Sequence, residues 1–141
     1  MEYTIEVITI PVTDVDRAKD FYTKVGFSVD VDYAPTSQFR VVQLTPPGSA
    51  CSIQIGVGIT DAEPGSSHSC YLVVNDLRQA QTELEAAGIA VSGPEHKAPL
   101  DTWAGGFEPG IDPDRTDYAS FLRMVDPDGN TWLIQERGHH R

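Results

Sequence analysis

Three side chains in the second half of the chain have types suited to binding or proton transfer. Arg123 is able to pair a ligand carboxylate, phosphate or enolate, because a guanidinium presents several N–H donors in one plane. Tyr71 could donate a hydrogen bond or move a proton, and His96 is the best candidate for a general base. Each has a plainer alternative: an arginine paired with an acid, an aromatic wall residue and an exposed histidine. These three are the candidate catalytic residues if the protein is an enzyme.

Other residues with chemical potential predict no metal or redox centre. Cys51 and Cys70 do not form a Cys-x-x-Cys pair, so we expect reduced, buried thiols. Asp112, Asp114 and Asp117 lie close together, but the prolines among them and the missing glutamate at the twelfth loop position argue against a calcium loop.

The composition excludes several classes of protein. The chain has 141 residues, with 21 Asp+Glu against 10 Lys+Arg and a formal net charge of −11, which argues against a nucleic-acid partner and against docking on anionic membranes. No apolar run approaches the ~20 residues of a membrane helix, and the first residues lack a signal-peptide layout. We therefore expect one cytoplasmic domain over residues 1–141.

The elements that must position these residues come in two copies. Residues 10–29 align with residues 72–91 without a gap at an offset of 62. Identical pairs are Val12/Val74, Asp14/Asp76, Ala18/Ala80, Gly26/Gly88 and Val29/Val91. Such a repeat indicates that one supersecondary unit is used twice.

Each copy predicts a strand, a helix and three further strands. Asp14 and Asp76 are the expected N-caps, because their carboxylates can accept the free amide hydrogens of the first helical turn. Gly26 and Gly88 are the expected helix stops. The later strands are expected at 27–33, 39–45 and 51–57, and at 89–92, 120–125 and 131–135. Two βαβββ modules follow, at about 4–58 and 67–137.

This pattern resembles the vicinal oxygen chelate superfamily, also called the glyoxalase/bleomycin-resistance/dioxygenase family. The resemblance rests on the segment from Thr13 to Tyr22, on Gly26-Phe27 and on the turn Asp126-Pro127-Asp128-Gly129-Asn130. It covers roughly residues 4–137 and implies an α+β fold. In that fold the two modules form an open, cup-shaped eight-stranded barrel with the helices outside, and a homodimer is expected.

The resemblance also implies where a metal would bind. Metal-dependent members place a ligand, usually His, seven residues before each helix-capping Asp, and a carboxylate in the last strand of each module. Here those positions hold Val7 and Ser69, then Gln54 (or Ser52) and Leu133. None supplies the family's imidazole or carboxylate, so we expect no metal and no cofactor. A relocated site using His68, Gln54 or Glu136 stays open as an alternative.

Strand alternation then predicts what faces the cup. Alternate side chains along a strand share one face. Residues that alternate with the expected metal positions should therefore also point into the cup. We expect the ligand to contact Val7, Thr9, Gln54, Ser69, Tyr71, Phe121, Arg123, Leu133 and Gln135. This lining is mostly apolar with a few polar groups, as is usual for small-molecule pockets.

An insertion at 96–118 distinguishes the second copy from the first. It carries Trp103 and Phe107 among glycines and prolines, which suits a lid that closes on an apolar ligand. A loop that clamps the surface or packs at a dimer interface is the alternative. We add both aromatic residues to the expected binding residues.

The sequence favours a protein that binds a small apolar or aromatic metabolite or antibiotic. The first alternative is an enzyme of the same fold, a lyase, isomerase or dioxygenase, either metal-free through Arg123, His96 and Tyr71 or with a relocated metal. A second alternative is an interaction module that serves mainly for dimerisation. The expected partners are a small-molecule ligand and a second copy of the chain.

Overall fold

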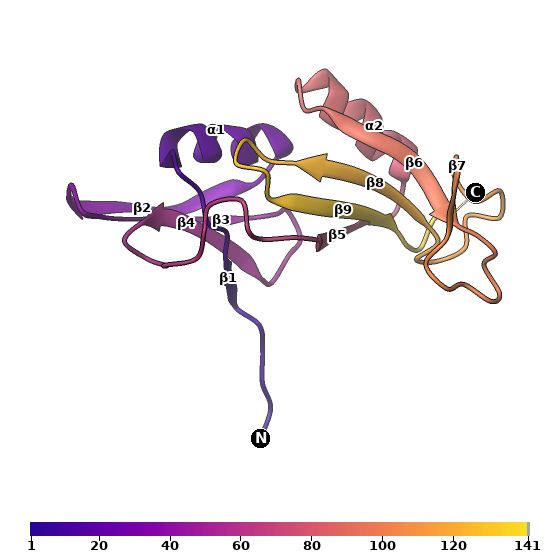
Figure 1. Ribbon diagram of the computed structural model, residues 1–141, viewed down its shortest axis with the longest axis horizontal. Coiled ribbons are helices and arrows are strands. Elements are labelled where there is room, and N and C mark those ends of the chain that lie inside the picture. Colours follow the sequence, from indigo (N-terminus) through magenta and orange to yellow (C-terminus); the bar gives the residue numbers. More distant parts are fainter. Residues whose placement is uncertain (141) are drawn as a thin grey trace. The chain divides into compact units, whose positions relative to one another are not determined.

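The computed structural model describes residues 1–140, which divide into two compact units (Figure 1). Unit 1 consists of residues 1–68 and 126–130, and unit 2 consists of residues 69–125 and 131–140. Within the described residues there are two helices and nine strands, which form two mixed sheets. The α+β class is confirmed, and the first half has the predicted βαβββ order, whereas the second half has one strand more than predicted. The closure of the two halves into one cup stays a prediction. Neither helix is long and apolar enough to cross a membrane.

Unit 1 is a four-stranded sheet with one helix. Its elements are β1 (Val7–Thr9), α1 (Val15–Val25), β2 (Ser28–Thr36), β3 (Phe39–Thr45) and β4 (Ser52–Val57). The strand order is β1-β4-β3-β2, with β1 parallel to β4 and the other pairs antiparallel. The core lies between one sheet face and α1, where Val42, Leu44 and Ile55 are fully buried together with Ala18 and Tyr22.

Unit 2 repeats this plan with one strand more. Its elements are β5 (Cys70–Val74), α2 (Leu77–Ala86), β6 (Val91–Lys97), β7 (Phe107–Pro109), β8 (Ser120–Val125) and β9 (Thr131–Glu136). The order is β5-β9-β8-β6-β7, with β5 parallel to β9. Leu122, Met124, Trp132 and Ile134 are buried on the side of α2, as the alternation predicts.

Both helices begin where the repeat predicts, and α1 ends there too, whereas α2 is capped by Ala87, one residue before the expected Gly88. Asp14 accepts a hydrogen bond from the Arg17 N–H at 3.0 Å, and Asp76 accepts one from the Gln79 N–H at 3.1 Å. These bonds satisfy amide groups that have no partner inside the helix. Gly26 follows α1 with a φ of 120°, a conformation that glycine adopts without the strain of a β-carbon.

The insertion is more regular than the sequence suggests. The strand expected at 89–92 continues to Lys97, and β7 pairs with it antiparallel. In register, Glu95 lies opposite Pro109 and Lys97 opposite Phe107. Local patterning misses this hairpin because its prolines and glycines are typical of loops. Pro109 is tolerated because β7 is the edge strand of the sheet.

The turn at residues 126–130 belongs to unit 1 and is bonded to the segment around α1. The Tyr22 hydroxyl donates to Asp126 Oδ2 at 2.7 Å, and the N–H groups of Asp128 and Asn130 donate to Asp126 Oδ1 at 2.9 Å. The Thr13 hydroxyl donates to Asp128 Oδ1 at 2.6 Å. Asp126 and Asn130 are buried, so these bonds replace water for the polar groups of the turn.

Candidate functional site

Four aromatic rings form a continuous row on the face of the unit 2 sheet that α2 does not cover. Tyr71 contacts Phe121 with ring centroids 6.4 Å apart, Phe121 contacts Phe107 at 5.8 Å, and Phe107 contacts Trp103 at 5.7 Å. All three contacts are edge-on, the geometry favoured by the charge distribution of aromatic rings. We call these four residues the aromatic row.

Strand register explains why these rings meet. Tyr71 lies opposite Leu133, which lies opposite Arg123, and Gln135 lies opposite Phe121. Residues directly opposite each other in neighbouring strands project from the same face. The structure therefore brings together most of the predicted binding residues of the second module. They are Tyr71, Trp103, Phe107, Phe121, Arg123, Leu133 and Gln135.

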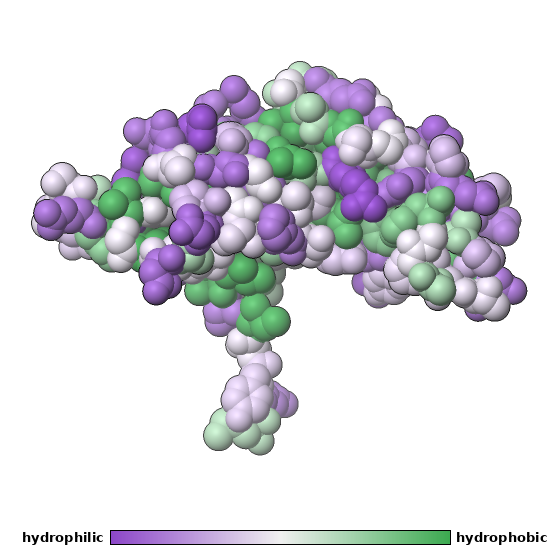
Figure 2. Space-filling model, viewed as in Figure 1, coloured by the Kyte–Doolittle hydropathy of each residue, from purple (hydrophilic) through white to green (hydrophobic). Residues whose placement is uncertain are grey.

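The aromatic row is unusual because most of it is accessible to solvent. Tyr71 is 54% exposed, Trp103 41% and Phe107 38%, whereas Phe121 lies beneath them at 3%. Exposed large aromatic side chains that contact one another form an apolar patch, and such patches mark interaction surfaces on soluble domains. Hydrophilic residues cover much of the face shown in Figure 2, in keeping with the acidic composition.

Arg123 on this face already has an acidic partner. Its guanidinium lies 2.6 Å from Glu95 Oε1 and its Cζ lies 5.4 Å from the Phe107 ring. The side chain of Arg123 is 46% exposed. Because Glu95 neutralises its charge, Arg123 is less suited to bind a ligand anion than its residue type alone suggested. Sequence reasoning missed Glu95 because it lies beyond the expected end of its strand.

The segment that carries Trp103 is held in place by its own backbone. The Trp103 Nε1–H donates to the Gly106 carbonyl at 2.6 Å, and the Ala98 N–H donates to the same carbonyl at 3.1 Å. A β-carbon at Gly106 would lie 2.7 Å from the Ala98 carbonyl oxygen, so this approach requires glycine. Movement of this segment as a lid stays a prediction.

His96 does not join Tyr71 and Arg123. It lies opposite Ser120, whereas its neighbour Glu95 lies opposite Phe121, so alternation turns the imidazole to the other face of the sheet. There Nδ1 lies 2.8 Å from the Gly110 carbonyl oxygen, and the side chain is 17% exposed. The structure does not assemble the three candidate catalytic residues. The expectation treated His96 as a loop residue, which is why its direction was missed.

The predicted residues of the first module lie in unit 1, on the sheet face without α1. Thr9 is in register with Gln54, whose Nε2 donates to the Thr9 hydroxyl at 2.8 Å. Val7 is 42% exposed. Figure 2 shows hydrophobic residues near the start of β1, where Ile5, Val7 and Ile8 are exposed.

Ser69 takes up a special position just before β5. Its backbone has a φ of 63°, and its N–H donates to the Thr131 hydroxyl at 2.8 Å. The left-handed conformation interrupts the strand at this point, so simple alternation does not extend to Ser69. Ser69 is exposed, and its contact with a ligand stays a prediction.

The residues at the expected metal positions do not fit a divalent ion. Val7 and Leu133 have no donor atom, and Ser69 and Gln54 offer only a neutral hydroxyl and a neutral amide oxygen. Divalent ions in such sites need imidazole, thiolate or carboxylate ligands.

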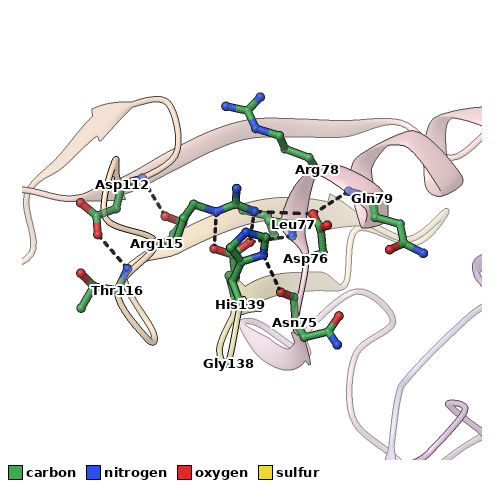
Figure 3. Close-up of polar contacts among 12 residues, drawn as sticks. Asn75, Asp76, Leu77, Arg78, Gln79, Asp112, Arg115, Thr116, Gly138 and His139 are labelled. Atoms are coloured by element: carbon green, nitrogen blue, oxygen red, sulfur yellow. Dashed lines mark hydrogen bonds and ion pairs between the residues drawn. The ribbon is translucent and has the colours of Figure 1, made fainter. Parts of the chain in front are cut away.

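A separate acidic cluster lies at the start of α2, where donor atoms of Asp76, Glu136 and His139 lie within 4.8 Å of one another (Figure 3). The Arg115 guanidinium already forms ion pairs with both acids. Arg115 donates to Glu136 Oε1 at 2.7 Å and to Oε2 at 2.6 Å, and lies 3.5 Å from Asp76 Oδ1. A metal ion would therefore have to displace Arg115, so the cluster favours a structural role.

The electrostatics of this cluster agree with an ion pair. Burial opposes ionisation of Glu136, but the Arg115 guanidinium and the Leu77 N–H together outweigh it, so the pKa of Glu136 lies below its usual range. The hydrogen bond to Glu136 raises the pKa of Arg115. Figure 3 shows the Asp76 carboxylate and the Arg115 guanidinium pointing toward one another.

Metal analysis tests these assignments. The variant His140→Ala breaks up the pair of adjacent histidines and leaves His139 in place. After soaking and desalting, we expect it to retain well under one equivalent of zinc, nickel, manganese or iron. Plasma mass spectrometry gives the metal content. One tightly held equivalent that disappears in Glu136→Gln would show that the acidic cluster is a metal site.

The sequence and the fold both resemble those of known proteins. The family described as the Glyoxalase/Bleomycin resistance protein/Dioxygenase superfamily matches residues 4–134. Among solved structures, TnmS3, an antibiotic binding protein from Streptomyces sp. CB03234, is 24% identical, with 96% of each chain covered and a TM-score of 0.70. A glyoxalase/bleomycin resistance protein from the same organism is 25% identical, covering 94% of this chain and 100% of its own, with a TM-score of 0.68. A superfamily member from Sphaerobacter thermophilus DSM 20745 is 22% identical, covering 96% and 98%, with a TM-score of 0.70. A search of curated proteins gave no match.

Proposed function

Because the chain belongs to the glyoxalase/bleomycin resistance protein/dioxygenase superfamily, we propose that it binds a small apolar or aromatic metabolite or antibiotic on the aromatic row. The observation that carries the proposal is the contact of four rings on a sheet face without a helix. Exposed ring surfaces offer a planar ligand both apolar burial and stacking. The neighbouring Arg123 and Glu95 supply polar contacts that would orient it, whereas Gln135 is buried and donates to the Tyr118 carbonyl at 3.0 Å.

TnmS3, which shares this fold, is an antibiotic binding protein, and its likeness to this chain supports a binding function without identifying the ligand. The choice of ligand therefore rests on the aromatic row. An enzymatic function has less support from the geometry, since His96 faces away from Tyr71 and Arg123. The residues at the expected metal positions also lack the ligands for metal-assisted chemistry.

Titration with a neutral planar probe, 9-anthracenemethanol, tests the proposal. We expect saturable binding by isothermal titration calorimetry, and about tenfold weaker binding in Phe107→Ala, because the variant loses the ring surface against the probe. Phe107 is 38% exposed, so the substitution should leave the fold intact. Trp103→Ala is expected to weaken binding similarly and to remove the ligand-dependent change in tryptophan fluorescence, since Trp132 is only 4% exposed.

Phe39→Ala is the matched control for this experiment. Phe39 is 37% exposed and belongs to β3 of unit 1. The substitution Phe39→Ala removes the same type of side chain at the same exposure and leaves the aromatic row unchanged. The probe affinity of this variant should therefore stay within about twofold of that of the unsubstituted protein. Absence of probe binding, or equal weakening by Phe39→Ala and Phe107→Ala, would exclude the aromatic row as the ligand surface.

A further inference from the structure

Lys97 places a positive charge on the aromatic row without an acidic partner. Its Nζ lies 4.6 Å from the centroid of the Trp103 ring and 5.6 Å from that of Phe121. Within residues 1–140 no carboxylate comes within ion-pair distance of this ammonium, whereas Arg123 nearby is paired with Glu95. The aromatic row therefore carries one balanced ion pair and one uncompensated cation.

The position of Lys97 follows from the hairpin. It is the last residue of β6, its N–H donates to the Ala119 carbonyl at 3.0 Å, and it lies opposite Phe107 in β7. Alternation puts Lys97 on the same face as Glu95, two residues earlier. The side chain is half-buried against the rings. The ammonium thus lies close to the ring surface.

The ring faces stabilise the ammonium but leave its hydrogen-bonding capacity unused. A lysine ammonium has three N–H donors, and a π-face attracts the charge without accepting conventional hydrogen bonds. An anion stacked on the same rings could accept these bonds. The local dielectric would fall as the ligand excludes water, which strengthens the attraction between the ammonium and the anion.

We propose that the ligand of the aromatic row is a planar aromatic acid, whose carboxylate or ionised hydroxyl binds the Lys97 ammonium. This proposal rests on the proposed function and specifies the ligand class for the same surface. Lys97 is then the specificity-determining residue, and the Arg123–Glu95 pair is a neutral neighbour. The overall charge of −11 opposes the approach of anions, so any preference for an acid must come from a local cation.

Three probes with one ring system test the proposal: anthracene-9-carboxylate, 9-anthracenemethanol and 9-(aminomethyl)anthracene. By calorimetry at pH 7 we expect the carboxylate to bind about tenfold more tightly than the alcohol, and the ammonium compound most weakly. In Lys97→Met, which keeps a long apolar stem, the carboxylate should lose this advantage to within about twofold. The affinity for the alcohol should stay within about twofold.

Lys24→Met is the matched control, because it changes the net charge by the same amount. Lys24 is an exposed residue of α1 in unit 1, paired with Asp20 at 3.0 Å. The preference for the carboxylate should persist in this variant. Conversely, Glu95→Gln removes the acid that neutralises Arg123 and should raise the affinity for the carboxylate severalfold without a matching gain for the alcohol.

The outcomes separate this inference from the proposed function. Equal binding of carboxylate and alcohol, or a preference that survives Lys97→Met, would overturn the assignment of Lys97. If the alcohol still bound through Trp103 and Phe107, the proposed function would stand. Absence of binding by all three probes would overturn both. Unchanged thermal unfolding of Lys97→Met ensures that any lost preference reflects the charge and not the fold.

Discussion

Replacing Arg115 with methionine is expected to lower the free energy of unfolding at pH 7 by about 3 kcal/mol. Glu136 is 0% exposed and accepts two hydrogen bonds from the Arg115 guanidinium. In the variant, its carboxylate would keep only the bond from the Leu77 N–H, which lies at 2.8 Å. A buried charge that has lost its counter-ion strongly destabilises a protein, even where the intact ion pair adds little stability. Urea denaturation measures the change.

The pH dependence of this effect has a definite sign. In the unsubstituted protein the pKa of Glu136 is lowered, so its contribution to stability is present above the ordinary value near 4.5 and is lost as the pH falls through the folded-state value. Without Arg115, burial dominates and raises that pKa, so protonation stabilises the variant as the pH falls from 7. The difference between the two proteins should therefore shrink at pH 5.

Arg78→Met is the matched control for Arg115→Met. Arg78 lies in α2 and lines a pocket together with Arg115, but it is exposed and forms no ion pair within the described residues. Its substitution should change the free energy of unfolding by less than about 0.5 kcal/mol. A loss in Arg115→Met no larger than that of Arg78→Met, or one independent of pH, would contradict the role assigned to the pair with Glu136.

Asn130→Ala is expected to be similarly destabilising in unit 1, by about 3 kcal/mol. Asn130 is fully buried, and its Nδ2 donates to the Pro11 carbonyl and to Asp126 Oδ2, both at 2.8 Å. Its Oδ1 accepts from the Ser67 N–H at 3.0 Å. Alanine would remove all three bonds and leave a small cavity among polar groups that water does not reach. Thermal and urea unfolding measure the loss.

Asn75→Ala controls for the loss of an asparagine side chain. Asn75 is exposed, and its side chain makes no hydrogen bond within residues 1–140. We expect a change within about 0.5 kcal/mol for this variant. Comparable stability of Asn130→Ala and Asn75→Ala would show that the bonds of Asn130 contribute little, and that the turn at residues 126–130 is held by the bonds of Asp126 and Asp128.

Local sequence patterns predicted much of the fold because their physical causes are local. The caps Asp14 and Asp76 accept bonds from residues three positions later, so sequence spacing is sufficient to identify them. Alternation in β8 and β9 placed Phe121 and Gln135 on one face and Leu122 on the other, as the register bears out. Period-two patterning needs no knowledge of distant partners.

The candidate site was predicted only in part, because its remaining members depend on pairing between strands distant in sequence. Tyr71 and Phe121 were expected from strand parity, and Trp103 and Phe107 from the composition of the insertion. Glu95 and Lys97 were missed, since the continuation of β6 requires the partners β7 and β8. The same pairing places the His96 side chain on the opposite face of the sheet from the aromatic row. Sequence assigned Arg123 a candidate anion-binding role, but only the β6–β8 register brings it to Glu95.

The amino-acid sequence by itself determined the repeated βαβββ plan, the helix ends and the face on which most strand residues lie. Each depends on neighbours within a few positions along the chain. Only the tertiary structure decided which charges are compensated. The ion pair of Arg115 with Glu136 and the isolation of Lys97 above Trp103 both arise from contacts that sequence spacing does not encode. Charge compensation depends on three-dimensional distance, because electrostatic attraction weakens with separation in space, whatever the separation in sequence.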